Sequence, residues 1–323
     1  MSVPWSAAAR AAEMPAGWSP TTALYAAAAA ALALLVAVPA SAQADTGTPS
    51  VPSAPSQSVV STTGWYSPQP ADTVTIYEPD APGPFPAVIF VHGGAWGRSQ
   101  PIDGEFQWAD DLAQQQGWLV AVIGYPAKIP REQVVEPRAI AWAVDEIAHR
   151  SDVASSSVAL WGESAGAHLA LVAAYRDART LRPLVSGVVS VSGPTDMRTE
   201  YRSSAEVWLH AVSRFEGMSP RAARAAGSRR YSATSPVDLV NRRVPPTFQA
   251  ISRADPLVPA DQVRILTQRL HRADVMHQSV WLRGDAHSTT LESQTPAGGR
   301  HTVQELAVAF LEKVFARHRV SFD

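Results

Sequence analysis

Short, uninterrupted apolar runs alternate with segments of helical periodicity through most of this 323-residue chain. The runs are rich in valine, isoleucine and aromatic residues, and they lack the polar alternation of a strand with one solvated face. Uninterrupted runs of this kind are typical of strands buried on both faces of a parallel sheet. We place them at residues 87–91, 118–123, 157–161, 185–191, 247–251 and 279–282, after a half-buried, alternating strand at residues 73–77.

Five segments between and after these runs repeat apolar residues at the 3.6-residue spacing of an amphipathic helix. The alternation of strands and helices predicts an α/β fold with a mainly parallel central sheet and helices on both faces. Ligands of such folds bind beyond the carboxyl ends of the strands, so residues that directly follow a strand are the candidates for chemistry. The predicted helices span residues 105–115, 137–150, 165–175, 260–272 and 302–318.

The first 63 residues differ from the rest, because they contain three charged side chains and no histidine. Residues 23–38 form an apolar run of 16 that is followed by Ala40-Ser41-Ala42, a pattern that signal peptidase accepts. A transmembrane helix needs about 20 apolar residues, so we predict a signal peptide over residues 1–44 and no stable membrane span. The protein is therefore expected to be secreted or held in the cell envelope, with an N-terminal membrane anchor as the alternative.

The segment that follows the apolar run is rich in serine, threonine and proline and has no apolar periodicity. We predict that residues 45–63 form a disordered linker, because such a composition buries too little surface to fold. We predict that residues 64–323 form one folded domain. Within it, residues 197–243 are longer than a simple crossover and are predicted to form a small cap over the site.

The cap segment holds nine arginines against four acidic residues. It is interpreted either as a solvated, arginine-biased surface or as a basic cap that favours acids carrying a carboxylate or phosphate. For the whole chain the formal net charge is −2, which argues against a nucleic-acid binder. The absence of cysteine excludes disulfides, thiolate zinc sites and a cysteine nucleophile. No metal or organic cofactor is predicted.

A serine stands on a glycine-flanked turn, Gly162-Glu163-Ser164-Ala165-Gly166, between the strand at 157–161 and the next helix. A strand–turn–helix context of this kind raises the serine hydroxyl above the sheet and points a helix N-terminus at it. Small neighbouring residues leave room for the tight turn. Ser164 is therefore the predicted nucleophile.

A second glycine-rich loop, His92-Gly93-Gly94-Ala95-Trp96-Gly97, directly follows the strand at 87–91. A tetrahedral intermediate needs backbone N–H donors aimed at its oxyanion, and small residues let the backbone come close. Gly94 and Ala95 are predicted to supply two donors, together with the N–H of Ala165. We expect His92 to shape the loop rather than to transfer protons.

The acid and the base are predicted after two further strands. Asp255 follows the strand at 247–251, and His287 follows the strand at 279–282. A serine hydroxyl is a weak nucleophile, so a histidine must take its proton and a carboxylate must orient the imidazole. Asp196, which also follows a strand, is the rival acid, and Asp285 is expected either to shape the loop or to be solvated.

Taken together, the motifs GESAGAHLA, VHGGAWGR, ADPLVP and GDAHS resemble those of the α/β-hydrolase superfamily. More narrowly, they resemble carboxylesterases of the hormone-sensitive-lipase and bacterial feruloyl-esterase-like groups. The similarity covers about residues 70–320, and the order serine, aspartate, histidine along the chain is the one that this scaffold uses. Two positions depart from the pattern: Ala95 stands third in the HGGG-type motif, and Ala167 replaces a glycine after the elbow.

The predicted function is that of a serine carboxylic-ester hydrolase acting on short-to-medium acyl or aryl esters, with a small-molecule ester as substrate. Trp96 and Leu257 are expected to contact the substrate. An arylformamidase, amidase or serine peptidase with the same triad is the alternative. A non-catalytic binding module is a further alternative. Such a module would be expected to lack one residue of the triad, and all three are present in this sequence. The sequence makes no prediction of the oligomeric state.

Overall fold

The computed structural model describes residues 57–126, 137–180, 182–198, 211–213, 215–225, 227, 229–288 and 292–319. The predicted signal peptide, the first residues of the predicted linker and part of the predicted cap lie outside these ranges. Within them, no helix has both the length and the apolar character that a membrane crossing requires.

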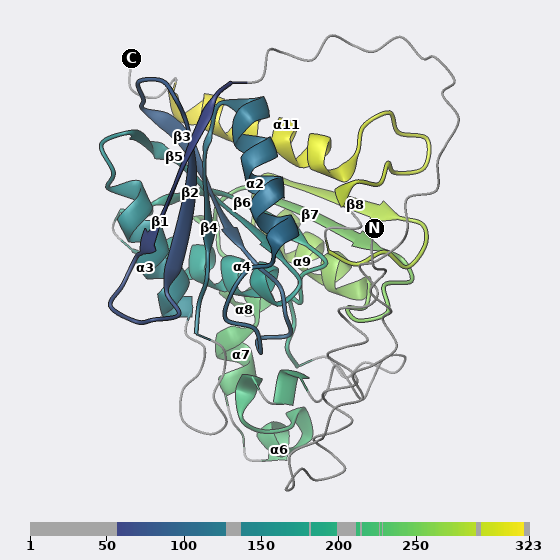
Figure 1. Ribbon diagram of the computed structural model, residues 1–323. Coiled ribbons are helices and arrows are strands. Elements are labelled where there is room, and N and C mark those ends of the chain that lie inside the picture. The colour runs from purple at the N-terminus through teal and green to yellow at the C-terminus, as the bar shows by residue number, and fades with distance from the viewer. Residues whose placement is uncertain are drawn as a thin grey trace, which may run out of the picture. The chain divides into compact units, whose positions relative to one another are not determined.

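An eight-stranded sheet forms the centre of the fold, in the order β1-β2-β4-β3-β5-β6-β7-β8 (Figure 1). The first two strands are antiparallel to their neighbours, and the pairs from β4 to β8 are parallel. The strands are β1 (Val59–Trp65), β2 (Thr73–Pro79), β3 (Phe85–Val91), β4 (Leu119–Ile123), β5 (Val153–Glu163), β6 (Val185–Val191), β7 (Thr247–Ser252) and β8 (His277–Leu282).

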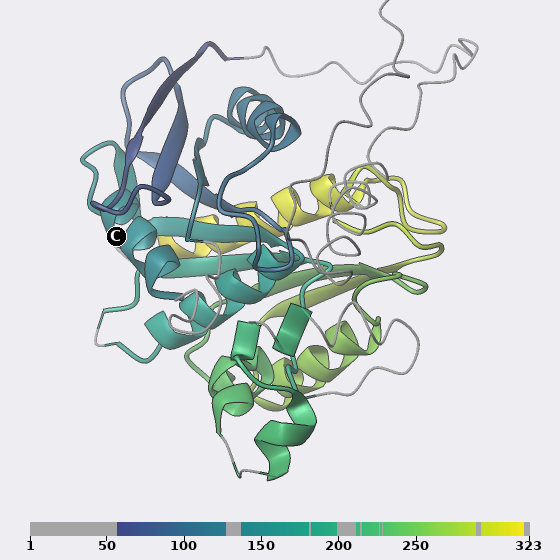
Figure 2. The same cartoon turned by 60° about the horizontal axis from the view of Figure 1, so that its bottom comes forward.

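Successive side chains of a strand point to opposite faces of the sheet, and the inner strands carry apolar side chains on both. Helices therefore cover both faces. On β3, Ile89 and Val91 face a core that includes α3, α4, α8 and α9, whereas Val88 and Phe90 face α2 and α11 (Figures 1 and 2). The helices are α2 (Asp103–Gln116), α3 (Pro137–Ala148), α4 (Ala165–Asp177), α6 (Pro220–Ala225), α7 (Arg230–Thr234), α8 (Pro236–Leu239), α9 (Asp261–Arg272) and α11 (Val303–Arg319).

All seven predicted strands and all five predicted helices are present, with ends that differ by a few residues. The fully apolar runs are the most deeply buried strands, since every residue of β4, β6 and β7 is buried. The α/β fold with a mainly parallel sheet is therefore confirmed. Five of the six apolar runs thus identified interior strands of the sheet, because a strand covered on both faces admits few polar residues, whereas the run at 279–282 belongs to the half-buried edge strand β8.

The predicted linker is wrong at its end, because residues 59–63 belong to the edge strand β1. This strand pairs with β2 from Val59, opposite Pro79, to Trp65, opposite Thr73. Most of its side chains are exposed, so it shows no apolar pattern. Backbone hydrogen bonds to β2 and the high strand propensity of valine and threonine hold it instead.

Candidate active site

Ser164 lies on a sharp turn between β5, which ends at Glu163, and α4, which begins at Ala165. Its backbone has φ 50° and ψ −120°, a left-handed conformation that is strained for a residue with a side chain. The Ser164 N–H donates to the carbonyl oxygen of Val191, at the end of β6, over 2.8 Å. The neighbouring strand therefore holds the turn in place.

The glycines of this turn are required by close packing. A Cβ on Gly166 would lie 2.0 Å from the carbonyl oxygen of Val91, at the end of β3. On Gly162 it would lie 2.6 Å from Cα of Ala167. Ala167 is itself accommodated because residue 193 is also glycine, where a Cβ would come within 2.8 Å of the Ala167 methyl group. Helix α4 can thus begin directly against the ends of β3 and β5.

The structure brings Asp255 and His287 together, as the sequence predicts. Nδ1 of His287 lies 2.8 Å from Oδ2 of Asp255, whose other oxygen accepts the N–H groups of Leu257 and Val258 at 2.9 and 2.8 Å. The carboxylate is fully buried, and the imidazole is 17% exposed. Because the carboxylate can only accept, Nδ1 carries the proton and Nε2 is the basic nitrogen.

The two other carboxylates considered from the sequence have different surroundings. Asp196 forms an ion pair with Arg198, with 3.1 Å between Nε and Oδ1. Asp285, two residues before His287, is exposed. Neither position matches the buried, doubly hydrogen-bonded environment of Asp255.

Ser192, which follows β6, links the loops that bear the predicted triad. Its hydroxyl accepts the N–H of Ser288 at 3.2 Å, next to His287, and its own N–H donates to Ala250 of β7 at 2.8 Å. The residue before it, Val191, accepts the N–H of Ser164. The sequence analysis missed Ser192, which is buried and has a strained φ of 51°. The sequence could have identified it by its position directly after a strand.

The loop after β3 has three consecutive residues with positive φ: Gly94 at 122°, Ala95 at 50° and Trp96 at 57°. A non-glycine residue in this region costs on the order of 1–2 kcal/mol. The ideal Cβ position of Gly93 lies 3.3 Å from Cβ of Ser164, so the loop passes directly beside the serine. The loop and the positive N-terminal end of α4 therefore both lie next to Ser164.

His92 is a buried part of the loop's support. Its ring stacks on Tyr125 with 4.2 Å between centroids, and the Tyr125 hydroxyl donates to the carbonyl oxygen of His92 at 2.6 Å. Burial lowers the pKa of His92 to about 3, so the ring is neutral at physiological pH. These contacts agree with a role in shaping the loop.

The two residues expected at the substrate pocket are placed differently. Trp96 turns into the core, where it is 2% exposed, and its indole N–H donates to Nδ1 of His168 at 3.2 Å. The structure therefore shows Trp96 as a support beneath the loop rather than a surface for substrate. Leu257 is partly buried beside Asp255 and packs against the core. The prediction for Leu257 stays a prediction.

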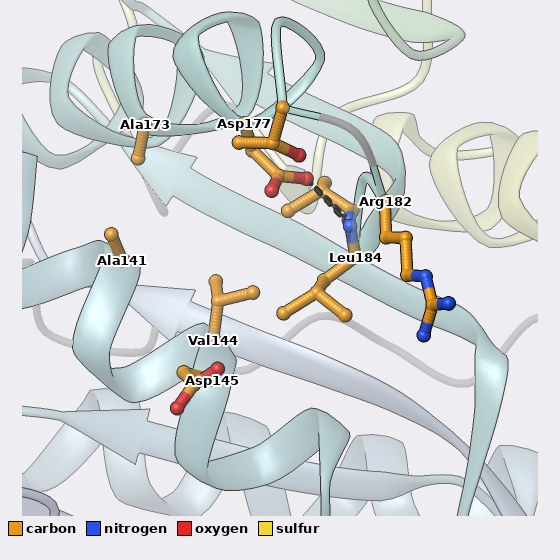
Figure 3. Close-up of a pocket in the computed structure, with 9 residues that line it drawn as sticks. Ala141, Val144, Asp145, Ala173, Asp177, Arg182 and Leu184 are labelled. Atoms are coloured by element: carbon orange, nitrogen blue, oxygen red, sulfur yellow. Dashed lines mark hydrogen bonds between the residues drawn. The ribbon is translucent and has the colours of Figure 1, made fainter.

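A cavity of about 290 Å³ lies at the opposite edge of the sheet, between α3, α4 and the start of β6 (Figure 3). Its lining includes Ala141, Val144, Asp177, Arg182 and Leu184. The predicted catalytic residues follow the carboxyl ends of their strands, whereas this cavity adjoins the amino end of β6. Among the residues that the structure describes, no group of three or more histidine, aspartate or glutamate side chains could hold a metal ion.

Comparisons with known proteins identify the family and the fold of this chain. Residues 74–270 match the model of the family described as BD-FAE. Esterase LipQ of Mycobacterium tuberculosis is 30% identical over 204 residues, which cover 58% of this chain and 46% of LipQ. The chain thus spans about half the length of that relative.

Solved structures with the same fold cover most of the chain. Esterase B from Lactobacillus rhamnosis has a TM-score of 0.65 and 17% identity, over 93% of this chain and 94% of its own. MGS-M1, an alpha/beta hydrolase enzyme from a Medee basin deep-sea metagenome library, has a TM-score of 0.59 and 16% identity, over 80% and 99%. These similarities establish the α/β-hydrolase fold.

Proposed function

The chain belongs to the BD-FAE family of α/β-hydrolases, and from that premise we propose that it is a serine carboxylic-ester hydrolase. Its substrates are short-to-medium acyl or aryl esters, and Ser164, Asp255 and His287 form its triad. The observation that carries the proposal is the 2.8 Å hydrogen bond between His287 and the buried Asp255. It lies at the same edge of the sheet as the strained turn of Ser164.

In the first step, Nε2 of His287 takes the proton of the Ser164 hydroxyl as its oxygen attacks the ester carbonyl. The carbonyl π bond breaks, and the resulting oxyanion accepts hydrogen bonds from the backbone N–H groups of Gly94, Ala95 and Ala165. Each donor of this type stabilises the transition state by about 3–4 kcal/mol. His287 then protonates the leaving alcohol, and an acyl group remains on Ser164.

In the second step, His287 removes a proton from water, and the hydroxide attacks the acyl carbonyl. Collapse of this intermediate returns the proton to the Ser164 oxygen and releases the acid. Asp255 holds the imidazole in the Nδ1–H tautomer and stabilises the imidazolium that forms twice in the cycle. The two backbone N–H groups that it accepts, from Leu257 and Val258, keep its orientation fixed.

The test is hydrolysis of a p-nitrophenyl ester series from acetate to palmitate by the wild type and by Ser164→Ala. We expect kcat to fall on the order of 10⁶-fold, because the nucleophile is removed. Asp255→Asn, which presents an amide N–H to Nδ1 and favours the wrong tautomer, is expected to lose about 10⁴-fold. A phosphonate ester should label the wild type on Ser164, as detected by peptide mass spectrometry.

Ser61→Ala, on the exposed edge strand β1, is the matched control and should keep wild-type rates. Esterase activity that survives Ser164→Ala would contradict the proposal. N-formylkynurenine and a peptide anilide, assayed in parallel, separate an ester hydrolase from an arylformamidase, amidase or peptidase with the same triad.

A further inference from the structure

Three aromatic rings from three separate segments meet beneath the loop that follows β3. Trp96 belongs to that loop, His168 to the first turns of α4, and Phe215 to the cap segment, residues 197–243. The Trp96 and Phe215 rings lie 4.9 Å apart at 29°, and His168 meets both edge-on at 5.4 and 5.2 Å. Contacts of this geometry stabilise a structure beyond simple burial of area.

His168 joins two of these segments by hydrogen bonds from its two ring nitrogens. Nδ1 accepts the indole N–H of Trp96 at 3.2 Å, and Nε2 lies 2.8 Å from the carbonyl oxygen of Thr234. The indole can only donate and the carbonyl can only accept, so the neutral ring must carry its proton on Nε2. Both polar atoms of the ring are therefore satisfied in one defined tautomer.

The interior surroundings of His168 keep the ring in this neutral form. The side chain is completely buried, and burial lowers its pKa to about 4. A protonated ring would present a second N–H to the indole donor of Trp96. The hydrogen bond from Trp96 therefore requires the neutral ring.

One further contact, within the cap segment, supports the same point. The hydroxyl of Thr234 donates to the buried carboxylate of Glu216, which follows Phe215 in the chain. The carbonyl oxygen of the same threonine accepts from His168. Phe215, Glu216 and Thr234 therefore tie the cap to the imidazole.

We propose that His168 is a positioning residue that fixes the oxyanion loop, residues 92–97, by holding Trp96 against α4 and the cap. The inference rests on the proposed function, since it assigns Ala95, the neighbour of Trp96, as an oxyanion donor. His168 touches no substrate and acts through the backbone of the loop.

Strain in the loop explains why such a clamp is needed. Ala95 and Trp96 both have left-handed backbones, and conformations of this kind persist only when the surroundings over-determine them. Loss of the clamp lets the loop relax and moves the N–H groups of Gly94 and Ala95 away from Ser164. A displacement of about 1 Å at a catalytic centre can cost on the order of 100-fold in rate.

The test compares His168→Phe with Tyr175→Phe, a matched variant at the far end of the same helix. Tyr175 is also fully buried, and its single side-chain hydrogen bond goes to Thr247 at 3.0 Å, away from the loop. With p-nitrophenyl acetate we expect His168→Phe to lower kcat by about 10- to 100-fold and to leave KM within about threefold. Tyr175→Phe should lose thermal stability and keep the wild-type kcat.

Two further variants keep the inference testable if His168→Phe folds poorly. Trp96→Phe removes the indole donor from the other side of the same hydrogen bond and should reduce kcat in the same way. Phe215→Leu removes the cap ring and should reduce kcat to a smaller extent. The effects of Trp96→Phe and His168→Phe should not add in the double variant, because both break one contact.

Amide hydrogen exchange of the full chain provides a readout that does not depend on activity. In His168→Phe, peptides covering residues 92–97 and 215–216 should both exchange faster than in the wild type, and in Tyr175→Phe they should not. If the wild type is active and His168→Phe changes neither kcat nor amide exchange, the inference about His168 is overturned and the proposed function stands. A wild type that hydrolyses no ester would overturn the proposed function, and the exchange comparison would then decide the inference by itself.

Discussion

The two edges of the central sheet differ in how their backbone is built. Six non-glycine residues in the described part of the chain have positive φ, and five of them lie in loops after β3, β5, β6 and β8. The sixth, Asp274, follows α9. The five at the carboxyl edge are Ala95, Trp96, Ser164, Ser192 and Ser288.

The amino edge has a cavity of about 290 Å³ and, among the described residues, one non-glycine residue with positive φ, Asp274 before β8. The Asp177 carboxylate accepts the N–H groups of Leu184 and Val185 at 2.7 and 2.9 Å and joins α4 to the start of β6 beside the cavity (Figure 3). Most of the strained residues and the described cavity therefore lie at different edges of the sheet, and the proposed triad lies at the strained one. Strained conformations are retained where the surrounding structure over-determines them, and such places are commonly functional sites.

Gly166→Ala is expected to have the largest effect of the changes that probe this comparison. The new methyl group would lie 2.0 and 2.3 Å from the carbonyl oxygens of Val91 and His92, so β3 and α4 must move apart. Overpacking of this kind costs about 1–3 kcal/mol or more, and here it displaces the nucleophile as well. We expect a clear loss of thermal stability and at least about a 100-fold loss in kcat/KM.

Gly104→Ala is the matched control, because no atom lies within 4 Å of a Cβ at this position of α2. Replacement of a helical glycine by alanine should raise stability by up to about 1 kcal/mol and leave kcat/KM unchanged. Wild-type activity and melting temperature in Gly166→Ala would show that the carboxyl edge is less tightly determined than its packing indicates.

A medium effect, on the pH dependence of stability, is expected at Glu292, whose side chain is buried below the carboxyl edge of the sheet. Oε1 of Glu292 accepts a hydrogen bond from the indole N–H of Trp161 at 2.6 Å. Trp161 belongs to β5 and stands three residues before Ser164 in the chain. Burial raises the pKa of Glu292 to about 8, so the folded protein keeps a proton that the unfolded chain releases near pH 4.5. This contribution to stability is complete below pH 4.5 and is lost as the pH rises towards 8.

Glu292→Gln should therefore flatten the dependence of stability on pH. Glutamine keeps an oxygen for the Trp161 donor and does not ionise. Between pH 5 and 8 the wild type should lose more unfolding free energy than the variant, by on the order of 3 kcal/mol. Urea unfolding at the two pH values measures the difference, with Glu312→Gln on the exposed side of α11 as a charge-removal control. Parallel pH profiles for the wild type and Glu292→Gln would contradict the prediction.

The sequence predicts the nucleophile, acid and base because each of these residues follows an apolar strand. A parallel sheet brings such positions to one edge, so a pattern along the chain becomes a neighbourhood in space. Asp255 and His287 are 32 residues apart in the sequence, and this rule brings them to the same edge of the sheet, where their side chains form a hydrogen bond.

Other features of the site depend on contacts that no local pattern records. Trp96 is buried in the core, where its ring contacts His168 and Phe215, and the sequence of the loop does not specify these partners. The partners of His168 lie 72 and 66 residues away, and nothing in the helix sequence around it specifies them. Edge strand β1 was missed for a related reason, because ladder hydrogen bonds rather than apolar side chains hold it.

The smallest effect is expected at the amino edge. Ala141→Leu adds three carbon atoms at the rim of the cavity, near Val144 and Leu184 (Figure 3). Leucine is nearly as good a helix former as alanine, so α3 should remain intact and the melting temperature should change little. We expect kcat/KM with p-nitrophenyl acetate to stay within about twofold of the wild type, because substitutions away from a functional constellation rarely perturb it. A tenfold loss in kcat/KM would show that a change at the cavity alters the surroundings of Ser164 through α4. The two edges of the sheet would then not be independent of one another.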